Sequence, residues 1–275
     1  MPKQKSSSSL PLIITCLLLL AVLVVAAVWT LGRSSAPTPP AVAENPFIFG
    51  GLPRATEAAA QYALLTNRAY IAGYSEARRD PLFTAYHLKG LPRLTSDKRP
   101  GKFSPDARTA AHITTEDYTR SGYDRGHMSP NHVIDVYFGA DAQLETFLMS
   151  NVVPQRHTLN AGVWEKIEML EADTYEPKFG EMWVIIGPVF GATPEVLTDG
   201  VQVPEACFRI WVRQEQGTPH VLACVCPNEG LTGKEQPEGY IATVKEIEER
   251  THLDFFEEEP AGEKARLEEE KTGLW

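Results

Sequence analysis

The chain has 275 residues, 43% of them hydrophobic, and a formal net charge of −10 at pH 7. This length and apolar content indicate a globular protein with one substantial core, and four cysteines are too few for a disulfide scaffold. The net charge argues against a nucleic-acid partner, because phosphate binding relies on lysine and arginine. However, much of the negative charge lies in residues 257–275, and Arg93, Lys98, Arg99 and Lys102 form a basic cluster.

The first 45 residues differ in composition from the rest of the chain. Residues 1–9 form a short tail, and residues 10–31 carry no charge and are long enough to cross a bilayer as a helix. Residues 32–45 form a linker rich in proline and small residues. We expect an uncleaved anchor, because the nearest small-x-small cleavage site lies about ten residues too far along the chain.

The charges flanking the predicted anchor suggest its orientation. Lys3 and Lys5 precede the span and only Arg33 follows it closely, so the positive-inside rule places the domain outside the cytoplasm. No arginine-rich transit peptide precedes the span, which favours a bacterial envelope. The alternative location is the mitochondrial inner membrane, with the domain facing the intermembrane space.

Residues 46–256 contain short apolar segments bounded by glycine or proline, and two segments with helical spacing. They predict an α+β domain with a central, mostly antiparallel sheet flanked by helices. Residues 257–275 predict an acidic tail, either a solvated helix or frayed. The predicted strands are 69–74 and 82–88, joined as a hairpin by 75–81, then 181–187, 206–212 and 220–226, and the predicted helices are 159–175 and 242–250.

Three of the four cysteines lie in the predicted domain. Cys224 and Cys226 are two residues apart and should point to the same face of one strand. Burial is the simplest role for both, and a bridge from Cys207 to either of them stays open.

The segment Asp124-Arg125-Gly126-His127 combines side chains suited to phosphate chemistry. Histidine accepts a proton near neutral pH. An arginine two residues before it lies on the same side of an extended chain and can grip a phosphate with its planar fork. A structural Asp-Arg pair beside a turn explains the tetrapeptide equally well.

Asn160 and Glu168 lie eight residues apart on the predicted helix at 159–175. An asparagine at the start of a helix is most often an N-cap. The spacing nevertheless leaves both side chains within about 80° of one face. An amide oxygen and a carboxylate suit Mg²⁺, which takes one or two protein oxygens and keeps several waters.

Three ordered blocks, DRGH at 124–127, SNVVPQ at 150–155 and LNAGVWEKIE at 159–168, resemble one family. They are similar to the DNA/RNA non-specific endonucleases of the ββα-metal, or His-Me finger, class, which includes Serratia-type nuclease and endonuclease G. The resemblance extends over nearly the whole domain, through RPGKFSPD at 99–106, WVIIGPVF at 183–190, CFRIWV at 207–212, CPN at 226–228 and VKEIEERTHLDFF at 244–256.

The resemblance implies Mg²⁺-dependent hydrolysis of DNA and RNA without sequence specificity, giving 5′-phosphates, with Mn²⁺ as an alternative metal and a homodimer as in relatives. The block MSPNHV after His127 departs from the endonuclease G pattern and leaves the roles of Asn131 and His132 open. The implied roles are His127 as general base, Asn160 as direct metal ligand, Glu168 as holder of metal-bound water, Arg125 and Asn151 as supports of the site, and Arg99 as a phosphate contact.

Two other classes of function were weighed. A zinc hydrolase could use His127, His132 and His157, but no common zinc-binding spacing occurs. A catalytically inactive nucleic-acid-binding module could keep the same fold. The presence of both His127 and Asn160 argues against it, because a decayed site needs neither.

Overall fold

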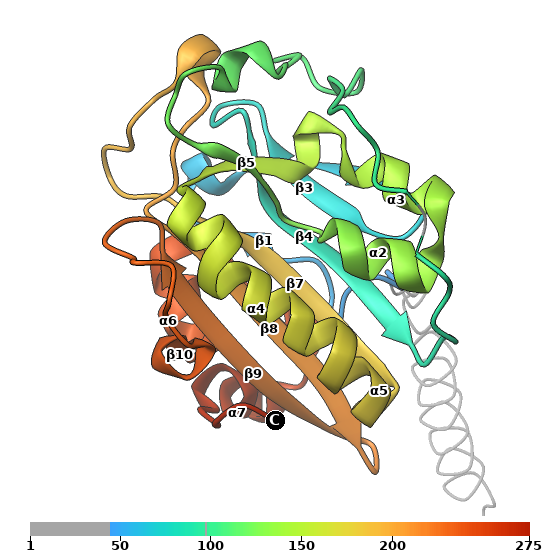
Figure 1. Ribbon diagram of the computed structural model, residues 1–275. Helices are drawn as coiled ribbons and strands as arrows, with labels where there is room; N and C mark the ends of the chain where they lie inside the picture. Colours follow the sequence, from blue (N-terminus) through green and yellow to red (C-terminus); the bar gives the residue numbers. More distant parts are fainter. Residues whose placement is uncertain (1–44, 97) are drawn as a thin grey trace, which may run out of the picture. The chain divides into compact units, whose positions relative to one another are not determined.

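The computed structural model describes residues 45–96 and 98–275 (Figure 1). The predicted tail at 1–9, the predicted anchor at 10–31 and the predicted linker at 32–45, except Asn45, lie outside the described residues. Within the described part, no helix is both long and apolar enough to cross a bilayer.

A seven-stranded sheet forms the centre of the domain, and every neighbouring pair of its strands is antiparallel. The predicted α+β class and antiparallel sheet are therefore confirmed, including the hairpin of β3 and β4 around residues 75–81. In spatial order the strands are β10 (Ile241–Ala242), β9 (Thr218–Pro227), β8 (Ala206–Glu215), β7 (Glu181–Val189), β4 (Asp80–Lys89), β3 (Ile71–Ser75) and β2 (Ala63–Thr66).

Helices cover both faces of this sheet, which explains why its strands have such continuous apolar sequences. Figure 1 shows α2, α4 and α5 in front of the sheet and α6 and α7 behind it. In β8, Trp211 packs toward the α4 face while Phe208 and Ile210 pack toward the α6 face, as alternation along a strand requires. The helices are α2 (Asn131–Phe138), α3 (Ala140–Thr146), α4 (Glu165–Leu170), α5 (Glu176–Phe179), α6 (Val244–Thr251) and α7 (Ala261–Glu269).

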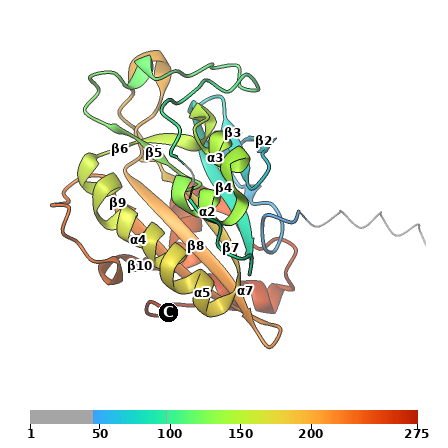
Figure 2. The ribbon, with the colours of Figure 1, turned by 45° about the vertical axis from the view of Figure 1, so that its right-hand side comes forward.

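The predicted helix at 159–175 is a composite. The α4 segment lies between two π-helical segments, Leu159–Trp164 and Glu171–Tyr175, and Gly162 has a non-helical backbone. Such π turns often occur at functional sites. A separate antiparallel pair, β5 (Asp124–His127) with β6 (Val152–Gln155), lies beside the start of this composite helix (Figure 2).

The acidic C-terminal segment, predicted as either a solvated helix or a frayed tail, is a helix, but it packs against the domain. It forms α7, whose Leu267 is fully buried, and Leu274 and Trp275 pack against the core on the α4 face. In a second short pair, β1 (Arg54–Ala55) with β11 (Leu253–Asp254), β11 is linked to α7 by the hydrogen bond from Lys264 to Asp254.

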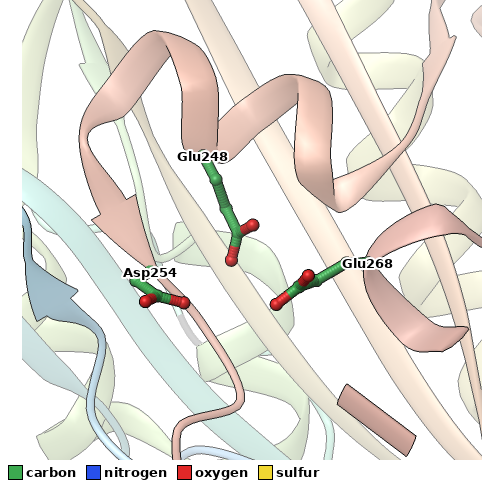
Figure 3. Close-up of side chains that lie close together, drawn as sticks. All are labelled: Glu248, Asp254 and Glu268. Atoms are coloured by element: carbon green, nitrogen blue, oxygen red, sulfur yellow. The ribbon is translucent and has the colours of Figure 1, made fainter. Parts of the chain in front are cut away.

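Three carboxylates from α6, β11 and α7 point toward one another, namely those of Glu248, Asp254 and Glu268 (Figure 3). Lys264 on α7 bonds to Asp254 and lies 3.7 Å from Glu268. Lys264 therefore partly offsets the repulsion among the three carboxylates of this acidic cluster. We assign the cluster a structural role where α6, β11 and α7 meet.

The cysteines face the same core. Cys207 lies directly opposite Cys226 on the neighbouring strand, and Cys207, Cys224 and Cys226 are free and buried. Cys207 and Cys226 thus occupy neighbouring strand positions, as a disulfide between them would require, but both thiols are free and pack in the core.

Candidate active site

The DRGH segment is strand β5, and its pairing with β6 sets the side-chain directions. Arg125 lies opposite Pro154 and His127 opposite Val152. Two residues apart on a strand, Arg125 and His127 share a side, and both line a cavity of about 260 Å³. Gly126 points the other way, where an added Cβ would lie 2.0 Å from the Gln155 Oε1 atom. Only glycine allows this approach.

The cavity gathers side chains from four parts of the chain: the loop before β5, the strand β5, the start of α2, and the composite helix. Besides the predicted site residues, its lining consists of Asn131, His132, Ala161, Glu165 and Met169. The structure thus brings together five of the six predicted site residues, Arg99, Arg125, His127, Asn160 and Glu168.

His127 is more enclosed than a catalytic side chain at an open surface. Its side chain is 8% exposed, and its ring centroid lies 5.1 Å from that of Phe103 and 5.0 Å from that of Phe147. Burial, assisted by the charge of Arg99, lowers the pKa of His127 to about 3. The imidazole is therefore neutral at pH 7. Its Nε2 atom is buried and has no hydrogen-bond partner among the described residues.

Asn160 does not act as a helix cap. Thr158 precedes the π-helical segment, while the Asn160 Nδ2 atom donates to the Asp124 Oδ2 atom at 3.0 Å. The same carboxylate oxygen lies 2.8 Å from Nδ1 of His157. Because Asp124 takes the amide nitrogen, the Asn160 Oδ1 atom is left as the acceptor. Asp124 thus orients the amide of Asn160, a contact that was not predicted from the sequence.

Glu168 lies above a buried cation. Its Oε1 atom is 3.6 Å from Nη2 of Arg209, which is fully buried and also pairs with Glu171 at 3.1 Å. Burial raises the pKa of Glu168 to about 7, although the positive charge of Arg209 opposes this shift. Arg209 was not among the predicted site residues. Its signal was a single arginine inside the apolar run CFRIWV, a position that demands a charged partner.

Asn151 is the predicted site residue that does not line the cavity. It is fully buried, and its side chain donates to the Ser129 and Thr146 carbonyls and accepts from the Ser129 N–H, at 2.9 to 3.0 Å. These bonds fix the backbone that follows His127. Its contribution to the cavity is therefore indirect.

His132 lies on the cavity wall with a defined partner. Its Nε2 atom accepts from Nη2 of Arg93 at 3.1 Å, and Arg93 also pairs with Asp173 at 2.6 Å. An arginine can only donate, so the Nε2 atom of His132 is the acceptor in this contact. This contact does not support a metal-ligand role for His132.

The available donors fit a hard, hydrated cation better than zinc. Asn160 offers an oriented amide oxygen and Glu168 a carboxylate, the oxygen ligands that Mg²⁺ prefers. Across residues 45–96 and 98–275, the acidic cluster of Figure 3 is the one group of three His, Cys, Asp or Glu side chains close enough to share an ion. The three histidines of the zinc alternative do not form such a group.

Several curated nucleases are similar in sequence to this chain. Among curated proteins, "Nuclease EXOG, mitochondrial" from Danio rerio is 31% identical over 236 residues, covering 79% of this chain and 65% of that protein. The same nuclease from Xenopus laevis is 33% identical over 200 residues, covering 66% of this chain and 55% of that protein. "Nuclease 1, mitochondrial" from Schizosaccharomyces pombe is 26% identical over 226 residues, covering 73% and 68%.

A solved structure has a similar fold, and a family model matches most of the chain. A chain in a crystal structure of the EndoG/EndoGI complex aligns with a TM-score of 0.68 at 22% identity, covering 77% of this chain and 90% of that one. The chain spans about two thirds or less of the length of the EXOG relatives. The family model described as DNA/RNA non-specific endonuclease matches residues 54–262. The chain therefore belongs to the DNA/RNA non-specific endonuclease family.

Proposed function

We propose that the protein is a Mg²⁺-dependent endonuclease that hydrolyses phosphodiester bonds of DNA and RNA without sequence specificity and leaves 5′-phosphates. One observation carries the proposal. A neutral, buried imidazole with an unpartnered nitrogen lines the same cavity as two arginines and an oriented asparagine. Because Nε2 itself is enclosed, the reacting water would meet the imidazole on the edge of the ring that lines the cavity.

The side chains divide the chemistry among themselves. His127 acts as general base and takes a proton from the water that attacks phosphorus. Arg99 and Arg125 contact the phosphate and offset its charge. Because these contacts go to phosphate and not to base edges, selectivity for sequence is weak. Because the nucleophile is external water, a ribose 2′-OH is unnecessary and DNA is as suitable as RNA.

A divalent cation completes the site. Asn160 would hold it directly through Oδ1, and Glu168 would hold it through an intervening water. When bound, Mg²⁺ supplies positive charge that stabilises the charge developing on the phosphate oxygens. Mn²⁺ accepts the same oxygen ligands. Asp124 keeps the amide of Asn160 in the orientation that this role needs.

The competing function is an inactive nucleic-acid-binding module of the same fold. A module that only binds phosphate needs Arg99 and Arg125, but it has no use for an enclosed neutral imidazole. The lowered pKa of His127 removes the positive charge that a binding role would want. The geometry therefore favours hydrolysis.

A plasmid-nicking assay tests the proposal. We expect cleavage with Mg²⁺, none with chelator, and none by the His127→Ala variant. DNA ligase should reseal the nicks, because it needs 5′-phosphate and 3′-hydroxyl ends. Nicks that cannot be resealed would refute the assigned products. Binding of DNA without any cleavage would establish the inactive module instead.

We also propose a membrane location and a homodimer. We propose that residues 10–31 anchor the protein in a membrane, with the domain outside the cytoplasm. Relatives named as mitochondrial nucleases support the mitochondrial alternative over the bacterial envelope. Digestion of intact mitochondria or spheroplasts with external protease tests this placement, and sedimentation of the purified domain tests the proposed homodimer.

A further inference from the structure

A second cavity adjoins the active-site cavity. It has a volume of about 520 Å³ and lies between the composite helix and the loop before β10. Glu165 and Met169 line both cavities, so the two spaces meet at these side chains. We call this second cavity the α4 groove. Its other main lining residues are Leu170, Thr174, Gln236 and Pro237.

The groove follows the helix away from the site of phosphate chemistry. Glu165, Met169 and Asp173 are spaced four residues apart and share one face of the helix. At 1.5 Å per residue they span about 12 Å. This length suits a nucleotide that flanks the scissile phosphate, extending from the active-site cavity along the helix.

The charges of the groove exclude a second phosphate. Its charged side chains are Glu165, Asp173 and Glu238 against Lys166. The ammonium of Lys166 donates to the Glu235 carbonyl at 2.7 Å, and the side chain of Asp173 pairs with Arg93. The balance is negative, in contrast to the arginines of the active-site cavity. A polyanion would keep its phosphates at Arg99 and Arg125 and turn another part toward the groove.

The apolar surface of the groove suits the flat face of a base. Met169 is 41% exposed, an unusual position for a large apolar side chain. Leu170 and Pro237 extend the surface on either side. A thioether is polarisable and makes favourable contacts with aromatic rings. Such contacts need no particular base, because every base has a π-face.

We propose that the α4 groove holds the nucleobase next to the scissile phosphate, packed against Met169. The inference rests on the proposed nuclease function and adds a base-binding subsite to it. The subsite explains why an exposed methionine stands beside a charged cavity. It contributes affinity without sequence selectivity.

Methionine oxidation tests the subsite without cleavage. Of the methionines in the described part of the chain, Met128, Met149 and Met182 are at most 3% exposed, whereas Met169 is 41% exposed. Hydrogen peroxide should therefore oxidise Met169 first. In chelator, we expect a single-stranded oligonucleotide to slow this oxidation several-fold. An abasic oligonucleotide of equal length should bind through its phosphates and leave Met169 reactive.

Two results of that experiment would overturn the inference. The first is unchanged oxidation of Met169 when a mobility-shift assay shows the oligonucleotide bound. The second is equal protection by the abasic strand, which would assign the groove to sugar and phosphate. Neither result depends on whether the protein cleaves nucleic acid, so failure of the nuclease proposal is recognised separately in the nicking assay.

Kinetics of Met169→Ala provide the second test, with Leu144→Ala as the matched control. Leu144 is a 57% exposed apolar residue on α3 and lines neither cavity. We expect Met169→Ala to lower kcat/KM for an oligonucleotide about five- to tenfold, near the lower end for loss of base stacking. Hydrolysis of the abasic strand should not change. Equal losses on both strands, or an equal loss in Leu144→Ala, would overturn the subsite.

Discussion

The two faces of the seven-stranded sheet differ in how their buried polar groups are partnered. On the face covered by α4, buried atoms of Arg125, His127, Asn131 and Arg209 lack hydrogen-bond partners. Within residues 45–96 and 98–275, no such atom belongs to α6, α7 or β11 on the other face. On that face, Thr243 and Glu246 cap the N-terminus of α6 with two reciprocal hydrogen bonds, a capping box.

This difference suggests a functional role for the α4 face and a stabilising role for the α6 face. A buried polar group without a partner costs about 1–3 kcal/mol, so a cluster of them lowers stability unless a ligand supplies the missing bonds. Under the proposed function, we expect the α4 face to be arranged for a bound substrate and ion and the α6 face to hold the domain together. Substitutions on the first face should change activity more than stability, and substitutions on the second should do the opposite.

The largest expected effect is that of His127→Ala. Loss of a general base lowers kcat by about 10²- to 10⁴-fold. The free energy of unfolding should change by less than about 2 kcal/mol, because removing an unpartnered nitrogen offsets part of the lost ring packing. Plasmid cleavage and thermal unfolding measure the two quantities. Loss of the fold in this variant, or retention of a tenth of wild-type activity, would contradict the expectation that substitutions on the α4 face change activity more than stability.

A smaller effect is expected from Asp124→Ala. This change frees the amide of Asn160 to rotate, and loss of a residue that orients a metal ligand typically costs about 10- to 100-fold in metal affinity. Titration with Mn²⁺, followed by its paramagnetic signal, measures the affinity. His157→Ala is the matched control, because His157 is the other partner of the Asp124 Oδ2 atom. Equal affinities for Asp124→Ala and wild type would remove Asp124 from the site.

Local patterns predicted five strands of the central sheet and two helical segments, but they missed α2, α3 and the pair of β5 and β6. Long-range pairing could not be predicted from them. Arg125 and His127 share a side because strands have a period of two, which a sequence shows directly. The bond from Asp124 to Asn160 spans 36 positions and depends on how β5 pairs with β6. The contact of Arg209 with Glu168 depends on the register of β8 beneath α4.

The C-terminal segment shows a second limit of sequence patterns. In α7, a single buried leucine, Leu267, anchors a helix whose other residues are mostly charged. One apolar residue in two turns gives almost no helical periodicity. Composition alone therefore predicted a solvated helix or a frayed tail, and only packing against the sheet shows that the segment belongs to the domain.

The pH dependence of metal binding tests the role of Glu168 on the α4 face. Burial raises the pKa of Glu168 to about 7, so its carboxyl group is protonated below that pH. A proton then competes with the ion, and affinity should fall about tenfold for each pH unit from 7 to 5. Mn²⁺ titrations at several pH values measure this slope. Glu168→Gln should abolish the slope, and an unchanged slope in that variant would assign the titration to another group.

The smallest effect is expected on the α6 face, from Glu248→Gln. Burial, with the nearby Glu268 and Asp254, raises the pKa of Glu248 to about 7 (Figure 3). A carboxyl group with a raised pKa in the folded state stabilises the fold while it is protonated. That stabilisation is complete below the unfolded pKa, about 4.3, and is lost as pH rises to 7. Because Glu248 is partly exposed, we expect a loss of about 1–2 kcal/mol.

Urea unfolding at pH 5 and pH 8 measures this linkage. Glu248→Gln should be more stable than wild type at pH 8 and about equal at pH 5, because glutamine carries no charge and can still accept from the Phe255 N–H, which Glu248 bonds at 2.8 Å. Glu249→Gln, an exposed change on the same helix, is the control for altered net charge. Activity should follow wild type in both variants, because α6 lies on the face opposite the candidate active site. A change in activity without a change in stability would show that the two faces are coupled.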